Sequence, residues 1–398
     1  MKRFTLGSSS IGDLEKKYVA EVLDRNYISP GPVVEHVERE CARLHSFKRG
    51  LAVNSGQSAI FIALQAIING HLANKQDKPL VAVPASTYIS TLSAAVLAGC
   101  DIVLIDVEIE TGNMCHVSLV NTIIKQRELD DPIDIVIPVH LYGKACDHRI
   151  KEICKTYKLW VIEDACEATF APGIGWGHIL TTSFYTNHLI SAGGGGMIMT
   201  NDDQLNEYCW KLINHGRTTR MNNDDIHRIS EKFHFDTWGH SFKWNDVNAA
   251  IARAQIERKD ELYAVRCRNA ETLTTMFQNN FHESMAYGAA PFNLPEHKDH
   301  CFMMYPIVLH EPLNTANVIR YLNEHGVEVR RMMPITNQPI VREYFGGSAL
   351  KEFPNADLIN RQGFYMGVHP ELTESDMEEM GSVIDEAIKQ EANRLNID

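Results

Sequence analysis

The sequence has few of the features that mark secreted or membrane-embedded proteins. Its nine cysteines include no CxxC pair, and such an odd, scattered set fits reduced thiols better than a disulfide framework. No stretch approaches 18 consecutive apolar residues, and the first residues contain no apolar segment typical of a signal peptide. From these absences we expect a soluble, cytoplasmic protein.

An excess of positive charge is also missing. The chain has 38 Lys+Arg against 51 Asp+Glu and a formal charge of −13, which argues against nucleic acid or a membrane surface as a partner. With 44% apolar and 22% charged residues, it is neither disordered nor collagen-like. A length of 398 residues predicts two domains, which we place at 1–255 and 256–398.

Several catalytic motifs are absent. There is no Walker A, GxSxG or HExxH motif, and GIGWG at 173–177 lacks the strand–turn–helix context of a dinucleotide site. These absences exclude a P-loop NTPase, an α/β-hydrolase and a Rossmann dehydrogenase. The His- and Cys-containing run at 297–301 is interpreted as a solvated loop, and we expect no metal.

The first half instead alternates short apolar runs with helical patterns. Near-continuous Val/Ile runs between amphipathic stretches predict a mostly parallel sheet covered on both faces, hence an α/β fold. The expected strands are 79–84, 102–106, 134–139, 159–163, 181–186 and 196–200, with helices at 57–69 and 147–157.

The second half has a different pattern. Residues 245–280 predict one long helix with little punctuation. A smaller α/β domain should follow, with strands at 302–309 and 327–332 and helices at 314–325 and 373–394.

Three segments contain residues suited to chemistry. Asp164 follows a buried strand at the sheet edge where α/β proteins bind ligands, although a lone Asp is more often a turn or cap. The segment 54–59 (NSGQSA) opens a helix whose free amides suit a phosphate, and a simple capped loop is an equal alternative. In 183–197, His188 precedes four glycines, which require positive φ or a close approach.

Together these segments resemble the DegT/DnrJ/StrS sugar aminotransferases, a branch of the fold-type I pyridoxal-phosphate enzymes. The resemblance implies a large cofactor domain with a mostly parallel sheet, a smaller C-terminal α/β domain, and a homodimer with its active site at the interface. The matching segments are ISPGPVVEHVERE, AVNSGQSAIFIAL, VPASTYISTLSAAVLAGC, IPVHLYGKACD, VIEDACEA, SFYTNH, INHGR, AAIARAQIERKDEL and VHPELTESD.

The resemblance also implies how this chain binds pyridoxal or pyridoxamine phosphate. Asp164 would pair with the pyridinium nitrogen, Tyr88 would stack on the ring, and Glu167 would lie near the ring or its hydroxyl. Gly56, Gln57, Ser58 and Ser183 would hold the phosphate, with Ser241 reaching it from the neighbouring subunit.

The main departure from the family is His188, because aminotransferases carry at that position the lysine that bonds to the cofactor. Imidazole cannot form that bond, so the cofactor should be held noncovalently, and a histidine with an unperturbed pKa of ~6.5 can act as general acid and base. Lysine-to-histidine exchange marks the family's 3-dehydratases, which remove the C3 hydroxyl of a nucleotide-linked 4-keto-6-deoxy sugar.

Dispersed cysteines beyond residue 188 favour the type of dehydratase without an iron–sulfur cluster. Glutamate would be the amino donor that regenerates the cofactor. An aminotransferase whose lysine has been replaced, and a silent nucleotide-sugar-binding member, are the alternatives. The nucleotide and the sugar stay open, and the candidate substrate contacts are Asn187, Arg217, Arg220 and Arg330.

Overall fold

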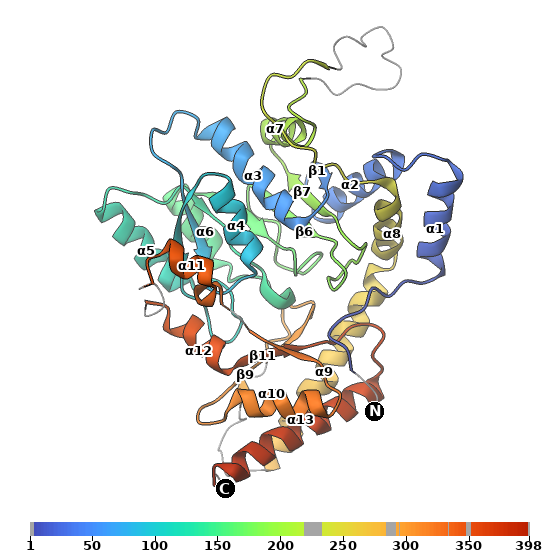
Figure 1. Ribbon diagram of the computed structural model, residues 1–398, viewed down its shortest axis with the longest axis vertical. Helices are drawn as coiled ribbons and strands as arrows, with labels where there is room; N and C mark the ends of the chain where they lie inside the picture. Colours follow the sequence, from blue (N-terminus) through green and yellow to red (C-terminus); the bar gives the residue numbers. More distant parts are fainter. Residues whose placement is uncertain are drawn as a thin grey trace.

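The computed structural model, shown in Figure 1, describes residues 4–218, 233–283, 292–293, 295–332, 334–347 and 352–396. Their strands form a seven-stranded sheet of order β1-β7-β6-β5-β4-β2-β3 and a four-stranded sheet of order β10-β11-β9-β8. The large sheet comprises β1 (Arg49–Val53), β2 (Leu80–Pro84), β3 (Asp101–Ile105), β4 (Ile135–Val136), β5 (Trp160–Asp164), β6 (Ile179–Ser183) and β7 (Gly196–Thr200).

Strands β3, β2, β4, β5 and β6 run parallel, whereas β7 pairs antiparallel with both β6 and β1. Helix α3 packs against β5, β6 and β7 and contacts α4 and α7, while α2 packs on β1 and β7. The helices of this half are α1 (Asp13–Asp24), α2 (Pro32–Leu44), α3 (Gly56–His71), α4 (Ile89–Leu97), η1 (Leu141–Gly143), α5 (His116–Glu128), α6 (Arg149–Tyr157) and α7 (Asp203–Ile213).

In Figure 1 the small sheet, α10 and α13 lie below the large sheet. One buried cluster joins this sheet to α9, α10 and α13 through residues such as Leu273, Ile307 and Ile384. The elements are α8 (Asp246–Glu257), α9 (Lys259–Glu283), β8 (Phe292–Asn293), β9 (Tyr305–Leu309), α10 (Thr315–Glu324), β10 (Val329–Arg331), η3 (Ile335–Asn337), α11 (Pro339–Tyr344), α12 (Pro354–Gln362), β11 (Gly363–Met366) and α13 (Glu374–Arg394).

The predicted α/β architecture is confirmed, and so are most strands to within a few residues. Strands β1, β8 and β11 were not predicted, and only two residues of 134–139 form β4. The prediction of a single long helix was wrong. Helix α8 ends at Glu257 and α9 begins at Lys259, and the guanidinium of the intervening Arg258 pairs with the fully buried carboxylate of Glu15 at 3.0 Å. The domain division at residue 255 stays a prediction.

The solvated-loop interpretation of 297–301 holds for His297 and Lys298, which are exposed, but was wrong for the last two residues. His300 is 4% exposed and stacks on the Phe302 ring at a centroid distance of 3.8 Å, and Cys301 is fully buried. Within the described ranges, no helix combines the length and the apolar character needed to cross a membrane.

Candidate active site

A cavity of about 370 Å³ opens at the carboxyl ends of β2, β5 and β6. Asp164 is the last residue of β5 and Ser183 the last of β6, while Tyr88 lies between β2 and α4. This is the edge at which open α/β sheets bind ligands. The cavity brings together Gly56, Gln57, Tyr88, Asp164, Glu167, Ser183, Asn187, His188 and Arg330, all singled out from the sequence.

The Asp164 carboxylate is held rigidly on the cavity wall. It is 3% exposed, its Oδ2 accepts a hydrogen bond from Thr91 Oγ1 at 2.8 Å, and its Oδ1 accepts one from the Cys166 amide at 3.1 Å. Each carboxylate oxygen has a second lone pair, so the group can still accept a hydrogen bond from a ligand. Asp164 therefore combines the predicted turn contact with a ligand-facing position.

Helix α3 begins at this cavity. Ser55 is its N-cap and accepts a hydrogen bond from the Ser58 amide at 3.1 Å, so Ser58 belongs to the cap and not to the cavity wall. The first-turn amides of Gly56 and Gln57 have no intrahelical acceptor, which suits an anion. A Cβ on Gly56 would come within 2.8 Å of the Ser183 Cβ, so glycine lets α3 approach β6.

Sequence reasoning missed Ser55, which lines the cavity, although Ser before a helix is the usual N-cap signal. It also missed Tyr142 and Tyr365, whose rings lie 5.2 Å apart on the wall. Tyr142 adopts a left-handed φ of 56°, and its amide donates to Glu167 Oε2 at 2.8 Å. Burial, assisted by the nearby Asp164 charge, raises the pKa of Glu167 to about 7.

His188 is enclosed by the connection between β6 and β7. Its Nδ1 atom is buried and has no hydrogen-bond partner among the described residues, and its main-chain amide donates to the Tyr185 carbonyl at 2.9 Å. Burial lowers the pKa of the imidazole to about 4. The ring is therefore neutral at physiological pH, with a nitrogen available to a ligand or a proton.

We expect the His188 imidazole of the unliganded protein to stay neutral as the pH falls from 7 to 5. Burial disfavours the imidazolium ion, whereas the unfolded chain takes up that proton near pH ~6.5. The stability linked to His188 is then present above pH ~6.5 and lost as the pH falls toward 4. Nitrogen NMR of labelled histidine, assigned with His188→Asn, measures the titration, and a folded-state midpoint near 6.5 would contradict the burial.

The four glycines at 193–196 serve both purposes predicted for them. Gly193 and Gly195 have φ of 76° and 124°, where side chains other than hydrogen are strained. A Cβ on Gly195 would lie 2.5 Å from the Trp244 ring, and one on Gly196 would lie 2.6 Å from the Ser55 carbonyl oxygen. The glycines thus let the backbone that leads into β7 approach both Trp244 and the start of α3.

Gly195→Ala should destabilise the protein by about 2–4 kcal/mol, because it combines a strained φ with a clash against a buried ring. Gly194→Ala is the matched control, since its φ is not positive and its Cβ would meet nothing closer than 3.9 Å. Urea unfolding of the two variants measures the difference. Equal free energies of unfolding for the two variants would show that the Trp244 ring can move aside without loss of stability.

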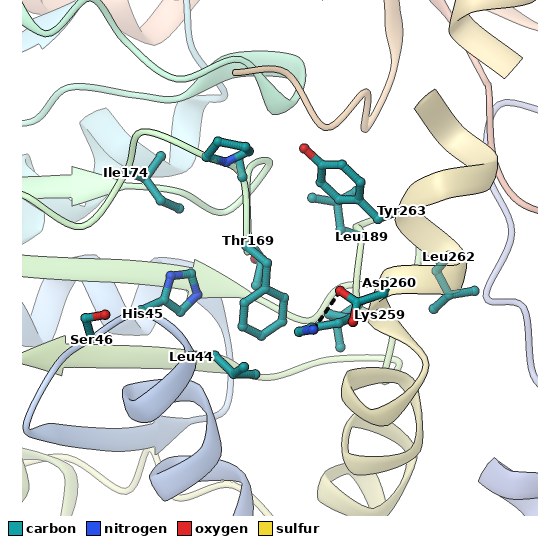
Figure 2. A pocket seen from close by; sticks show the side chains of 14 residues that line it. Leu44, His45, Ser46, Thr169, Ile174, Leu189, Lys259, Asp260, Leu262 and Tyr263 are labelled. Carbon is teal, nitrogen blue, oxygen red and sulfur yellow. Dashed lines mark hydrogen bonds and ion pairs between the residues drawn. The ribbon is translucent and has the colours of Figure 1, made fainter. Parts of the chain in front are cut away.

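Three predicted residues, Ser58, Ser241 and Arg217, do not line this chain's cavity. Ser58 caps α3, and Ser241 Oγ accepts a hydrogen bond from Lys243 Nζ at 3.0 Å. The backbone of Arg217 forms an isolated antiparallel β-bridge with Phe235, and Arg220 lies outside the described residues. A separate cavity of about 520 Å³ contains none of the predicted residues, although Leu189 and Ile190, which directly follow His188, line it (Figure 2).

The donor set fits pyridoxal or pyridoxamine phosphate. The start of α3 with the Ser183 hydroxyl suits a phosphate, and the Asp164 carboxylate suits a protonated ring nitrogen. Tyr88 is 71% exposed in the single chain and offers an aromatic face at the cavity rim. No lysine belongs to the wall that the described residues form, so a covalent link to the cofactor has no donor there.

The fold and this cavity define a fold-type I pyridoxal-phosphate enzyme. Residues 9–385 match the model of the DegT/DnrJ/EryC1/StrS aminotransferase family, and the chain belongs to that family. The GDP-perosamine synthase of Caulobacter vibrioides is 29% identical over 98% of this chain and 99% of its own length.

Two solved structures share the fold. Helicobacter pylori PseC, an aminotransferase involved in pseudoaminic acid biosynthesis, is 18% identical with a TM-score of 0.85, covering 98% of this chain and 100% of its own. The Escherichia coli GDP-4-keto-6-deoxy-D-mannose-3-dehydratase with bound hydrated pyridoxal phosphate is 21% identical with a TM-score of 0.84, covering 96% and 100%. The predicted cofactor is thereby confirmed at the level of this family.

Proposed function

We propose that this protein is a pyridoxamine-phosphate-dependent 3-dehydratase of a nucleotide-linked 4-keto-6-deoxy sugar, acting in polysaccharide biosynthesis in the cytoplasm. The observation that carries the proposal is His188, which lies on the cavity wall at the position where the family's aminotransferases have their lysine. Glutamate is the proposed amino donor that restores the cofactor.

Each residue has a definite task in this proposal. The Gly56 and Gln57 amides and the Ser183 hydroxyl bind the cofactor phosphate, and Asp164 accepts a hydrogen bond from the protonated ring nitrogen. When bound, pyridoxamine phosphate supplies an amine that can condense with the sugar ketone and a ring that accepts electrons. His188, neutral before reaction, would accept a proton from the cofactor methylene carbon and would supply one to the departing C3 hydroxyl.

A second candidate is a sugar aminotransferase. The 29% identity to a GDP-perosamine synthase over almost the whole chain favours it. It requires that the proton transfers normally made by a lysine amine be made by His188 or by a group not on this wall. The two candidates share fold and cofactor and differ in whether the product has lost its C3 hydroxyl or gained an amine.

The deciding experiment combines the protein, pyridoxamine phosphate and glutamate with GDP-, CDP-, TDP- and UDP-linked 4-keto-6-deoxy sugars. Mass spectrometry of the sugar product separates the outcomes. A 3-deoxy ketone supports the dehydratase, an amino sugar supports the aminotransferase, and no turnover with any substrate supports a binding protein. Omitting glutamate should limit the dehydratase to one turnover per molecule of pyridoxamine phosphate supplied, because the spent cofactor is then not re-aminated.

We also propose that the protein acts as a homodimer. Ser241, Lys243 and Arg217 lie away from this chain's cavity, where they can serve the cavity of a second copy. Lys243 and Arg217 would bring positive charge to a cofactor and substrate that are both anions. Light scattering at micromolar concentration tests this proposal, and a monomer with full activity would overturn it.

A further inference from the structure

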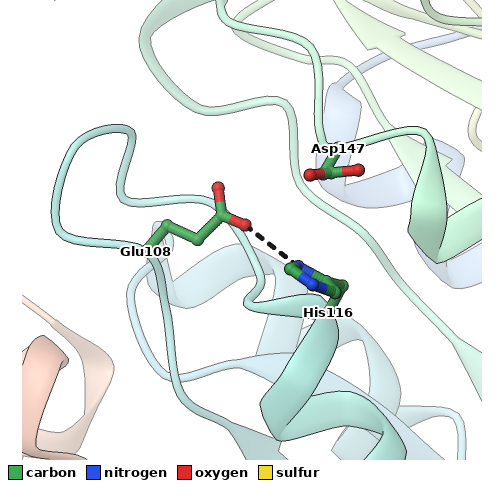
Figure 3. Close-up of side chains that lie close together, drawn as sticks. All are labelled: Glu108, His116 and Asp147. Atoms are coloured by element: carbon green, nitrogen blue, oxygen red, sulfur yellow. Dashed lines mark ion pairs between the residues drawn. The ribbon is translucent and has the colours of Figure 1, made fainter.

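Three potential metal ligands converge outside the active-site cavity (Figure 3). Glu108 lies in the connection between β3 and α5, His116 is the first residue of α5, and Asp147 lies just before α6. One ligand atom from each lies within 4.8 Å of the other two, and Glu108 Oε1 is 3.5 Å from His116 Nδ1. The side chains are 22%, 21% and 16% exposed for Glu108, His116 and Asp147, so they form a partly enclosed group.

The cluster has unsatisfied bonding capacity. His116 Nδ1 is a buried atom with no hydrogen-bond partner among the described residues, at 3.5 Å from the nearest carboxylate oxygen. Thr111 Oγ1 donates at 3.3 Å to Glu108 Oε2, which leaves Oε1 facing the imidazole. Burial, and to a lesser degree the nearby Asp147 charge, raises the pKa of Glu108.

One cation already contacts the cluster. Arg149 Nε donates to both carboxylate oxygens of Asp147 at 2.9 and 2.8 Å. This pairing occupies the Asp147 carboxylate, while Glu108 Oε1 and His116 Nδ1 face each other at 3.5 Å. A bound dication would satisfy both groups at once.

We propose that Glu108, His116 and Asp147 form a site for a divalent transition-metal ion of the Zn²⁺ class, in which a water molecule would complete the coordination. Imidazole together with carboxylate is a donor set that these ions favour over Mg²⁺ or Ca²⁺. In a tetrahedral Zn²⁺ site with bonds of about 2.1 Å, ligand atoms lie about 3.4 Å apart. Glu108 and His116 already have that spacing, so the Asp147 carboxylate has to move toward the other two.

Such an ion would join two segments that already contact each other. Asn113 Nδ2 donates to the Lys144 carbonyl and its Oδ1 accepts from the Leu141 amide, so the β3–α5 connection is tied to residues 141–147. Leu141 and Tyr142 of the second segment line the active-site cavity. The ion would therefore stabilise the segment that contributes Leu141 and Tyr142 to the active-site cavity. None of its three ligands lines that cavity itself.

Calorimetric titration of the chelator-treated full-length protein with Zn²⁺ tests the site. We expect one ion per chain and a higher melting temperature with Zn²⁺. His116→Ala and Glu108→Gln should each weaken binding at least about tenfold and abolish the temperature shift. His36→Ala, a histidine on α2 far from the cluster in sequence, is the control and should bind like the wild type.

A second variant acts in the opposite direction. Arg149→Ala removes the cation that occupies Asp147 and should tighten Zn²⁺ binding severalfold, a gain that general loss of structure cannot produce. Co²⁺ absorption distinguishes this site from the nine thiols, because thiolate ligands add a strong near-ultraviolet band. Absence of stoichiometric binding, a thiolate band, or equal binding by wild type and His116→Ala would each overturn the proposal.

Discussion

His188→Asn should slow dehydration of the sugar by about 10²–10⁴-fold, the usual contribution of general acid–base catalysis. Asparagine keeps a polar group in the enclosed position but has no group that gains or loses a proton near neutral pH. Affinity for pyridoxamine phosphate should stay within a few-fold of the wild-type value, because the phosphate and ring contacts come from α3, β5 and β6. Single-turnover kinetics and equilibrium dialysis measure the two quantities separately.

Two further variants make this result specific. His36→Asn on α2 should leave the rate unchanged. His188→Lys should let pyridoxal phosphate bond covalently to the chain, which borohydride reduction and the intact mass reveal. If His188→Asn turns over at the wild-type rate, the proton is moved by another group and the dehydratase proposal loses its main support.

Asp164→Asn should lower turnover by about 10²–10³-fold, as expected when a preorganised charge is removed from a reacting centre. The amide cannot stabilise a proton on the ring nitrogen, so affinity for pyridoxamine phosphate should fall as well. The fold should survive this change. Oδ1 can still accept from Cys166, and the Thr91 hydroxyl, bonded to Thr87 at 3.1 Å, can reverse its direction toward the new amide.

Asp106→Asn is the matched control for this variant. Asp106 is also a buried aspartate after a strand of the large sheet, and it accepts hydrogen bonds from the Asn355 and Ala356 amides, away from the cavity. It should lose stability without losing cofactor affinity. If both aspartate variants weaken cofactor binding equally, Asp164 acts only through the stability of the sheet.

The predicted strands of the parallel sheet correspond to apolar runs buried on both faces, which is why the sequence pattern located them. The pattern carries no information on direction, so the antiparallel β7 was not distinguishable from its parallel neighbours. Strand β1 begins with Arg49 and Gly50 and lacks such a run; a Cβ on Gly50 would meet the Glu38 carbonyl oxygen of α2 at 2.4 Å. That glycine reflects tertiary packing, which local sequence does not encode.

Candidate site residues in loops directly after strands could be found, because polar residues there interrupt strong apolar patterns. Thr91, which holds Asp164, lies inside an apolar helix and gives no such signal. Tyr365 comes from β11, at the far end of the chain, and approaches Tyr142 only through the packing of the small sheet. The predicted cross-subunit contact of Ser241 depends on a second chain, for which a single sequence has no pattern.

The pairing of β6 with β7 bears on how this scaffold can change its reaction over evolution. Ser183 pairs with Gly196, so both ends of the connection 184–195 are pinned by the sheet, and Leu189 and Ile190 are buried within it. The side chain at position 188 projects from this pinned loop and makes none of the sheet's hydrogen bonds. A substitution at position 188 can therefore replace one acid–base side chain with another while the pairing of β6 with β7 stays unchanged. The reaction of such an enzyme can change without a change in its fold.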